Sequence, residues 1–113
     1  MIEICITALA LVALTFMSAR ANRKFRHERR LPMQWSVSGL VNWTAPRPLA
    51  LAFTPLLAGA LLVTTTFSTL VLPPHPGQES LGALVIAIMS ISFIAAHALH
   101  LWLIDRMLNR NGS

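Results

Sequence analysis

Three long blocks of apolar residues divide the chain, and shorter polar stretches separate them. The blocks cover residues 4–19, 48–72 and 81–104. A helix needs about 20 apolar residues to cross a hydrocarbon core of ~30 Å, because lipid cannot hydrogen-bond free backbone groups. The second and third blocks have that length, and the first reaches it when residues 1–3 form its outer turn. The pattern predicts an all-α integral membrane protein with three transmembrane helices.

We expect a single membrane domain over residues 1–113. Its successive parts are helix one (2–19), a basic cytoplasmic extension (20–31), a tryptophan-containing loop (32–47), helix two (48–72), a short outer loop (73–80), helix three (81–104) and a basic tail (105–113). Because the loop between helices two and three is short, these helices are predicted to form an antiparallel hairpin.

Prolines and small polar residues mark the expected turns. Pro32 disfavours helical geometry in the residue before it, so the chain is expected to turn there, and Gly39 permits a second turn. Thr44 is predicted to be the N-cap of helix two, with Pro46 and Pro48 in its first turn, where their missing N–H groups have no intrahelical partner anyway. On this interpretation the tryptophan-containing loop connects two helices and needs no ligand.

The second loop carries similar signals. The proline pair at 73–74 stops helix two, Pro76–Gly77 turns the chain, and Ser80 is a candidate cap for helix three. Inside helix two, Pro55 is expected to leave a carbonyl unpaired and to kink the helix modestly.

Composition agrees with a membrane protein. Apolar residues make up 55% of the chain and charged residues 12%, whereas soluble domains carry about 25% charged residues. A cleaved signal peptide is the alternative for the first block, since residues 19–21 have the form Ala-x-Ala. The acidic start at Glu3 and the positive charge after the block disfavour it. The lone cysteine, Cys5, excludes an internal disulfide and a cysteine-based metal cluster.

The net charge of +5 is unevenly distributed. Six of the nine Lys and Arg residues lie close together, at Arg20, Arg23, Lys24, Arg26, Arg29 and Arg30. Arg47 ends the same loop, and the remaining two cations lie in the tail. The positive-inside rule therefore places residues 20–47 and 105–113 in the cytoplasm, and the N-terminus and residues 73–80 outside.

The three tryptophans support this orientation. Trp35, Trp43 and Trp102 would all lie at the cytoplasmic interface, where an indole ring is buried while its N–H stays hydrated. The cations between Arg20 and Arg30 are expected to attract anionic lipid by ~1 kcal/mol each, and a specific phospholipid or protein site is the alternative. Nucleic acid is not an expected partner, because no recognisable binding module accompanies the charges.

The segment that joins helices one and two also resembles a known signature. It reads LPMQWSVSGLVNWTAPRPLALAFTPLL, and the matching positions are Leu31, Pro32, Gln34, Trp35, Gly39, Asn42, Trp43 and Pro55. This ordered set in front of a span resembles the bacterial membrane domain known as domain of unknown function 1648, found in SdpI-type proteins. The resemblance covers about residues 30–65. It implies a bacterial inner-membrane protein, with toxin immunity and signal transduction known for some members, and it carries over no catalytic site.

The chain departs from the family pattern at several points. Gln34 stands where the family commonly has His, and Asn42 stands where it often has Asp, so no titrating or metal-binding role is implied there. The further helices of SdpI-type immunity proteins do not follow here. The signature loop often faces outward in the family, whereas the charges of this chain predict the cytoplasmic side.

His97 and His100 are the only ionisable residues in the third block. Spaced at i and i+3, they share one helix face, so both could approach one metal ion. A metal needs further ligands, and Asp105 lies ~12 Å along the axis from His97, too far to be a third ligand. We expect interhelical hydrogen bonds or interface placement and predict no cofactor, with metal, haem or proton transfer as the alternative.

Small residues recur along one face of helices two and three. They are Ala60, Thr64 and Ser68 on helix two, and Ala83, Ala87, Ser92 and Ala96 on helix three. Such rows let helices approach closely, and hydroxyls can bond across the contact. A polar path lined by the hydroxyls of residues 64–69 is the alternative to packing.

The sequence has no nucleophile set, carboxylate pair, phosphate-binding glycine loop or metal-ligand cluster, so we do not expect an enzyme. The leading hypothesis is a small non-catalytic inner-membrane protein that acts by association, as an accessory, regulatory or immunity-like partner of another membrane protein or of itself. Its interaction surface would be the small-residue faces and the tryptophan-containing loop. The alternatives are an oligomer that handles a cofactor, ion or solute through His97 and His100, and a scaffold that recruits a peripheral regulator to the basic loop.

Overall fold

Three long helices and one short β-hairpin make up the structure, a computed structural model of the chain. It describes residues 2–35, 41–72, 76–77 and 80–112, with side chains at all of these except 34–35, 41–42 and 110–112. The elements in chain order are α1 (Ile2–Lys24), β1 (Arg30–Trp35), β2 (Val41–Pro46), α2 (Arg47–Val71) and α3 (Leu81–Gly112). Each helix is long and apolar enough to cross a membrane. The chain is thus an all-α, multi-pass membrane protein with a small hairpin added.

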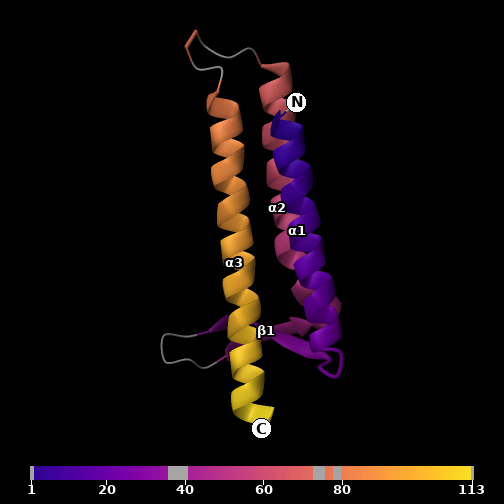
Figure 1. Cartoon of the computed structure of the whole chain (residues 1–113). Coiled ribbons are helices and arrows are strands. Elements are labelled where there is room, and N and C mark those ends of the chain that lie inside the picture. The colour runs from indigo at the N-terminus through magenta and orange to yellow at the C-terminus, as the bar shows by residue number, and fades with distance from the viewer. Residues whose placement is uncertain (1, 36–40, 73–75, 78–79, 113) are drawn as a thin grey trace.

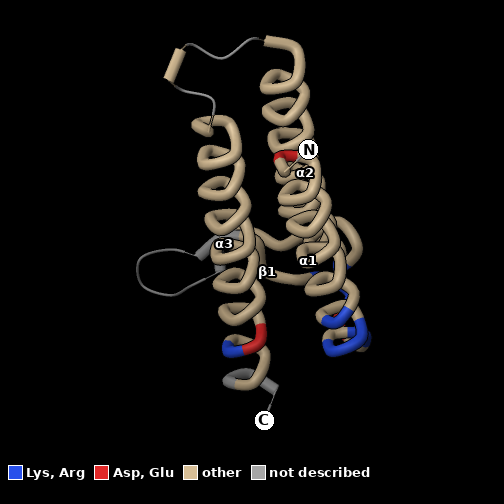
Figure 2. Tube along the Cα trace, turned by 45° about the horizontal axis from the view of Figure 1, so that its top comes forward, with Lys and Arg blue, Asp and Glu red and all other residues tan. Residues whose placement is uncertain are grey.

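The helices form an up-and-down bundle in which α1 and α3 run in the same direction and α2 runs against both (Figure 1). The predicted antiparallel hairpin of α2 and α3 is confirmed. The two chain ends lie at opposite ends of the bundle. Figure 2 shows cations gathered where α1 meets the β-hairpin, with a cation and a carboxylate of α3 at the same end of the bundle and a carboxylate near the N-terminus at the other. We call the first of these the basic end.

Two clusters of buried residues hold the helices together. The first lies along the middle of the bundle and contains Ala10, Leu14, Ala58, Leu62 and Ile86. The second lies at the basic end, where helices and hairpin meet, and contains Ala21, Phe25, Leu31, Ala45, Ala50, Leu51 and Ile104. The hairpin is therefore part of the basic-end core.

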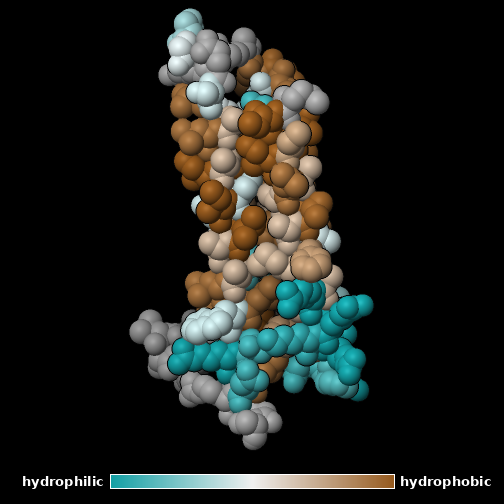
Figure 3. Space-filling model, viewed as in Figure 1, coloured by the Kyte–Doolittle hydropathy of each residue, from teal (hydrophilic) through white to brown (hydrophobic). Residues whose placement is uncertain are grey.

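Large apolar side chains cover the outside of the bundle. Leu9, Leu56 and Ile91 each keep about two thirds of their surface exposed, and Figure 3 shows such residues over most of its length, with hydrophilic residues at the basic end. In water, an apolar surface of this extent would drive aggregation, whereas in a bilayer it faces acyl chains. The buried side chains are therefore confined to the contacts between the helices, and the outward-facing apolar side chains are left for lipid.

The segment between α1 and α2 differs from the predicted loop. Strands β1 and β2 pair antiparallel, with Leu31 opposite Ala45, and the register is irregular on either side of Gln34. Leu31 and Pro32 are therefore extended and buried instead of forming a turn. Burial of Leu31 and Ala45 against the helix ends explains why extended backbone replaces the expected turn. Gly39, the expected second turn, lies outside the described residues.

The start of α2 also differs from the prediction. Thr44 lies in β2, and Pro46 occupies the N-cap position, with no side-chain hydrogen bond. Pro48 lies in the first turn of α2, as expected. Thr44 lies two residues before the N-cap position, and its hydroxyl instead accepts a hydrogen bond from Arg30 Nε at 2.8 Å, within the hairpin. The residue that was predicted to cap α2 is therefore part of the β-hairpin.

Two helices have different lengths from those expected. Helix α1 ends at Lys24, within the predicted basic extension, and α3 continues to Gly112, through the predicted tail. Lys24 Nζ lies 3.1 Å from Asp105 Oδ1, so an ion pair joins the two helices beyond the apolar blocks. Between α2 and α3, Gly77 has a φ of +82°, which suits the turn predicted at Pro76–Gly77. The proline pair at 73–74 lies outside the described residues.

Candidate functional site

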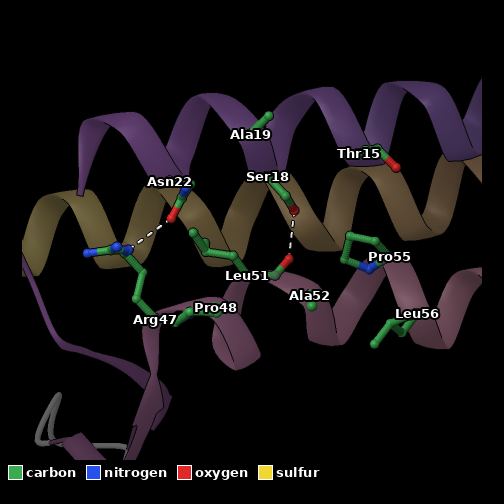
Figure 4. Close-up of a pocket in the computed structure, with 10 residues that line it drawn as sticks. All are labelled: Thr15, Ser18, Ala19, Asn22, Arg47, Pro48, Leu51, Ala52, Pro55 and Leu56. Carbon is green, nitrogen blue, oxygen red and sulfur yellow. Dashed lines mark hydrogen bonds between the residues drawn. The ribbon is translucent and has the colours of Figure 1, made fainter. Parts of the chain in front are cut away.

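Pro55 of α2 sets the geometry of the most polar point inside the bundle. A proline has no N–H, so the carbonyl four residues earlier, that of Leu51, receives no bond from it. Ser18 of α1 supplies the missing donor: its hydroxyl lies 2.7 Å from the Leu51 oxygen (Figure 4). Leaving a buried carbonyl unpaired costs about 1–3 kcal/mol, and water cannot replace the lost donor inside a bilayer.

His97 of α3 completes a hydrogen-bond chain across all three helices. Its Nε2 lies 2.8 Å from Ser18 Oγ. Because the Ser18 proton is donated to Leu51, Ser18 Oγ accepts from Nε2–H, which assigns the ring proton to Nε2. The imidazole is 0% exposed, and its Nδ1 has no partner among the described residues. We call the two hydrogen bonds that join Leu51 O, Ser18 Oγ and His97 Nε2 the three-helix bridge.

His100 has a different role from His97. Its Nε2 lies 3.1 Å from the carbonyl oxygen of Pro32, so it links α3 to the hairpin. The two histidines share a helix face, as expected, but they bond to partners on different elements. Across the parts of the chain that the structure describes, no three His, Cys, Asp or Glu side chains gather closely enough to hold a metal ion. Both histidines take part in contacts between elements.

A groove of about 450 Å³ runs beside the bridge between α1 and α2 (Figure 4). Its walls come from both helices: Thr15, Ser18, Ala19 and Asn22 on α1, and Arg47, Pro48, Leu51, Ala52, Pro55 and Leu56 on α2. Asn22 and Arg47 make one end polar, and Leu56 lies at the apolar end. The groove therefore changes from charged to apolar along its length.

Arg47 closes the end of α1 that faces this groove. Its Nε donates to Asn22 Oδ1 at 2.9 Å, and its Nη1 donates to the carbonyls of Arg26 at 2.6 Å and Glu28 at 2.8 Å. These two carbonyls lie in the turn that follows α1, so the guanidinium supplies donors to backbone oxygens just beyond the helix end. The partly buried charge of Arg47 is thus compensated by its hydrogen bonds to Asn22 and to backbone carbonyls.

The structure brings only part of the family-like signature together. Leu31 and Pro32 are buried in the hairpin, Trp43 on β2 is half-exposed, and Pro55 lies in α2 beside the groove. Gln34 and Trp35 lie in β1 and Asn42 lies in β2, but their side chains and Gly39 are outside the described residues. Of the described signature side chains, Leu31 and Pro32 have a packing role and Pro55 creates the need for the bridge.

The small-residue row of α2 points away from the other helices. Ala60 and Thr64 are exposed, whereas Ala58, Leu62 and Thr66 on the opposite face are buried. The row's hydroxyls bond within their own helix, Thr64 to the Ala60 carbonyl at 2.7 Å and Ser68 to that of Thr64 at 3.0 Å. On α3, Ala83 and Ala87 are partly buried and Ser92 and Ala96 are exposed. Packing inside the monomer leaves the α2 row unused.

Sequence reasoning missed Ser18 and Thr7. Thr7 of α1 and Thr66 of α2 share a buried hydrogen bond of 2.7 Å between their hydroxyls. The two residues are 59 positions apart in sequence. The only local signal is a small hydroxyl in an apolar block. Nothing nearby in the sequence identifies its partner.

Comparison with known proteins adds no assignment. No family model, curated protein sequence or solved structure matches the chain. The likeness of residues 30–65 to domain of unknown function 1648 therefore stays a prediction.

Proposed function

We propose that the protein is a small non-catalytic membrane protein that acts by association, with another membrane protein or with a second copy of itself. The observation that carries the proposal is the outward row on α2, at Ala60, Thr64 and Ser68. Small side chains allow a second helix to approach closely, which is the main source of helix affinity in lipid. Because the hydroxyls are already bonded within α2, contact would bury no unpaired donor.

The polar side chains of the spans support the same proposal. Ser18, His97, Thr7 and Thr66 bond to one another or to the backbone across helix contacts. They therefore hold the bundle together, and the one that lines the α1–α2 groove, Ser18, has its proton donated to the Leu51 carbonyl. The alternative of a cofactor-, ion- or solute-handling oligomer would need His97 and His100 to face a shared axis, and the described contacts give it no supporting observation.

The orientation and membrane also belong to the proposal. We place the basic end in the cytoplasm and the N-terminus outside by the positive-inside rule. The choice of a bacterial inner membrane rests on the family-like signature of residues 30–65. The cations at one end of the bundle support this orientation (Figure 2): Arg47 bonds to Asn22 near the end of α1, and Arg106 follows Asp105, which pairs with Lys24. So do the half-exposed indoles of Trp43 and Trp102. Family-like immunity or signalling roles fit the association proposal, but residues 30–65 alone suggest them.

Purification in mild detergent tests the proposal. We expect light scattering to give a protein mass above the 12.4 kDa of one chain. Thr64→Leu should reduce that mass, because the larger side chain holds a neighbouring helix away. Val63→Leu is the matched control, since Val63 is also exposed but lies about 100° around the helix. A uniform monomer, or equal loss in both variants, would contradict the proposal.

A further inference from the structure

A second groove lies between α1 and α3 at the basic end, separate from the α1–α2 groove. Its volume is about 350 Å³. Its walls are formed by Met17, Arg20, Ala21, Lys24 and Phe25 of α1 and by Leu101, Trp102 and Asp105 of α3. Charged groups and apolar groups thus line one space, at the level where both helices pass from apolar to charged sequence.

Cations predominate around this groove. Arg20 and Lys24 lie one helical turn apart on α1, and Arg106 stacks on the Trp102 ring, with its guanidinium carbon 5.2 Å from the ring centre. Asp105 is the only carboxylate among the lining residues, and it pairs with Lys24 at 3.1 Å. A net positive charge therefore remains for a ligand.

The Arg20 guanidinium makes no hydrogen bond or ion pair with any residue that the structure describes. Among the described residues its guanidinium has one contact, over the ring of Phe16 at 6.0 Å. A guanidinium offers five N–H donors in a planar fork that matches phosphate oxygens. Arg20 can therefore donate to an anion without breaking a hydrogen bond within the protein.

The apolar walls favour a lipid over a free anion. Met17, Ala21 and Leu101 offer aliphatic surface, and the Trp102 ring offers a flat surface that is half-exposed. Aromatic rings at this level suit the glycerol region of a bilayer, where one side is apolar and the other hydrated. Basic pockets between transmembrane helices are known sites for anionic lipid headgroups. A phosphodiester with attached acyl chains has both chemistries that the groove presents.

We propose that this groove binds one anionic phospholipid, with its phosphate at Arg20 and its glycerol and upper acyl chain against Met17 and Trp102. The site differs from the general attraction of lipid to residues 20–30, because it needs a cation, an aromatic ring and a groove together. It is also independent of the association proposed for α2, which uses another face of the bundle.

Quenching of Trp102 fluorescence tests the site. In a Trp35→Phe, Trp43→Phe background Trp102 is the only remaining tryptophan of three. The variant is purified in neutral detergent and titrated with phosphatidylglycerol or phosphatidylcholine carrying brominated acyl chains. We expect saturable quenching at lower concentrations of phosphatidylglycerol than of phosphatidylcholine. Native mass spectrometry of the chain with its tryptophans intact gives the same comparison through bound lipid mass.

Arg20→Gln and Arg23→Gln form the matched pair. Both residues are exposed on the last turns of α1, but only Arg20 lines the groove. We expect Arg20→Gln to weaken phosphatidylglycerol binding by about fivefold or more, the equivalent of one lipid-facing cation. Arg23→Gln should leave the saturable phase unchanged. Arg106 lies beside the groove, over the ring of the lining residue Trp102, so Arg106→Gln removes a second nearby cation and should also weaken binding.

Three outcomes would overturn the proposal. Equal weakening by Arg20→Gln and Arg23→Gln would mean that the lipid responds only to total charge. Equal quenching by the two lipids would mean that the headgroup is not selected. Displacement of the lipid by excess inorganic phosphate alone would mean that the groove is a site for a free anion.

Discussion

The Ser18 hydroxyl lies 2.7 Å from the Leu51 carbonyl oxygen, and this bond joins α1 to α2 where a proline has removed a helical donor. His97 then bonds to the same hydroxyl from α3. One small side chain thus satisfies a backbone acceptor in one helix and an imidazole donor in another. In lipid, where water cannot substitute, the positions of three helices depend on it.

Ser18→Ala is expected to destabilise the bundle by about 1–3 kcal/mol, because it leaves the Leu51 carbonyl and the His97 N–H unpaired away from water. Unfolding in mixed micelles, followed by circular dichroism, measures the change. Ser92→Ala, at an exposed serine of α3, is the control and should change the free energy of unfolding by less than about 0.5 kcal/mol.

A double-mutant cycle with Pro55→Ala separates the bridge from simple packing. Alanine at position 55 restores an N–H to the Leu51 carbonyl. Pro55→Ala should therefore stabilise the Ser18→Ala variant by about 1 kcal/mol more than it stabilises the unmodified chain. If the effects of the two substitutions on the free energy of unfolding are additive, Ser18 does not stabilise the bundle by bonding to the carbonyl that Pro55 leaves unpaired.

Gly82 and Gly59 are expected to respond in opposite ways to alanine. A methyl group at Gly82 would lie 2.9 Å from Thr69 Cγ2, so α2 and α3 would have to move apart, whereas at Gly59 the nearest atom is Leu11 Cδ2 at 3.8 Å. Overpacking costs about 1–3 kcal/mol, while Gly→Ala in a helix gains about 0.5–1 kcal/mol. Thermal unfolding in detergent should show Gly82→Ala below the unmodified chain and Gly59→Ala at or above it.

Arg47→Lys is expected to loosen the end of α1 although it keeps the charge. A single ammonium cannot reproduce the planar fork that contacts Asn22 and the carbonyls of Arg26 and Glu28. Amide hydrogen exchange should increase in residues 22–28 and in β1. Arg29→Lys is the control, because the exposed Arg29 side chain has no hydrogen bond to a described residue. Unchanged exchange in Arg47→Lys would show that charge alone closes the helix.

The proposed orientation predicts that tags fused to the two ends of the chain react on opposite sides of the membrane. A membrane-impermeant reagent applied to intact spheroplasts should modify an N-terminal tag and leave a C-terminal tag unmodified until the membrane is opened. Modification of both tags from outside would contradict the arrangement of three spans with the basic end inside.

Some of the missed structure had a local signal. The hairpin strands alternate apolar residues with a period of two, at Leu31 and Met33 in β1 and at Trp43 and Ala45 in β2. That alternation is typical of a half-buried strand. The prolines and the glycine of the segment pointed instead to turns, since their effect on the backbone is the stronger local signal. Burial of Leu31 at the helix ends decided between the two.

The apolar blocks alone were enough to predict lipid surroundings and three membrane-spanning helices. Apolar length and charge are properties of each segment alone, so three helices and their antiparallel order could be predicted without knowing any contact. Pro55 likewise shows, from its missing N–H, that the carbonyl of Leu51 needs another donor.

Which side chain is that donor depends on how the three helices pack. Ser18 and Leu51 are 33 positions apart, and Ser18 and His97 are 79 apart. A hydrogen bond depends on distances of a few tenths of an ångström, which follow from how three helices pack and not from any one helix's pattern. For the same reason the sequence pattern could not show whether the small row on α2 packs inside the bundle or faces outward, where the structure places Ala60 and Thr64.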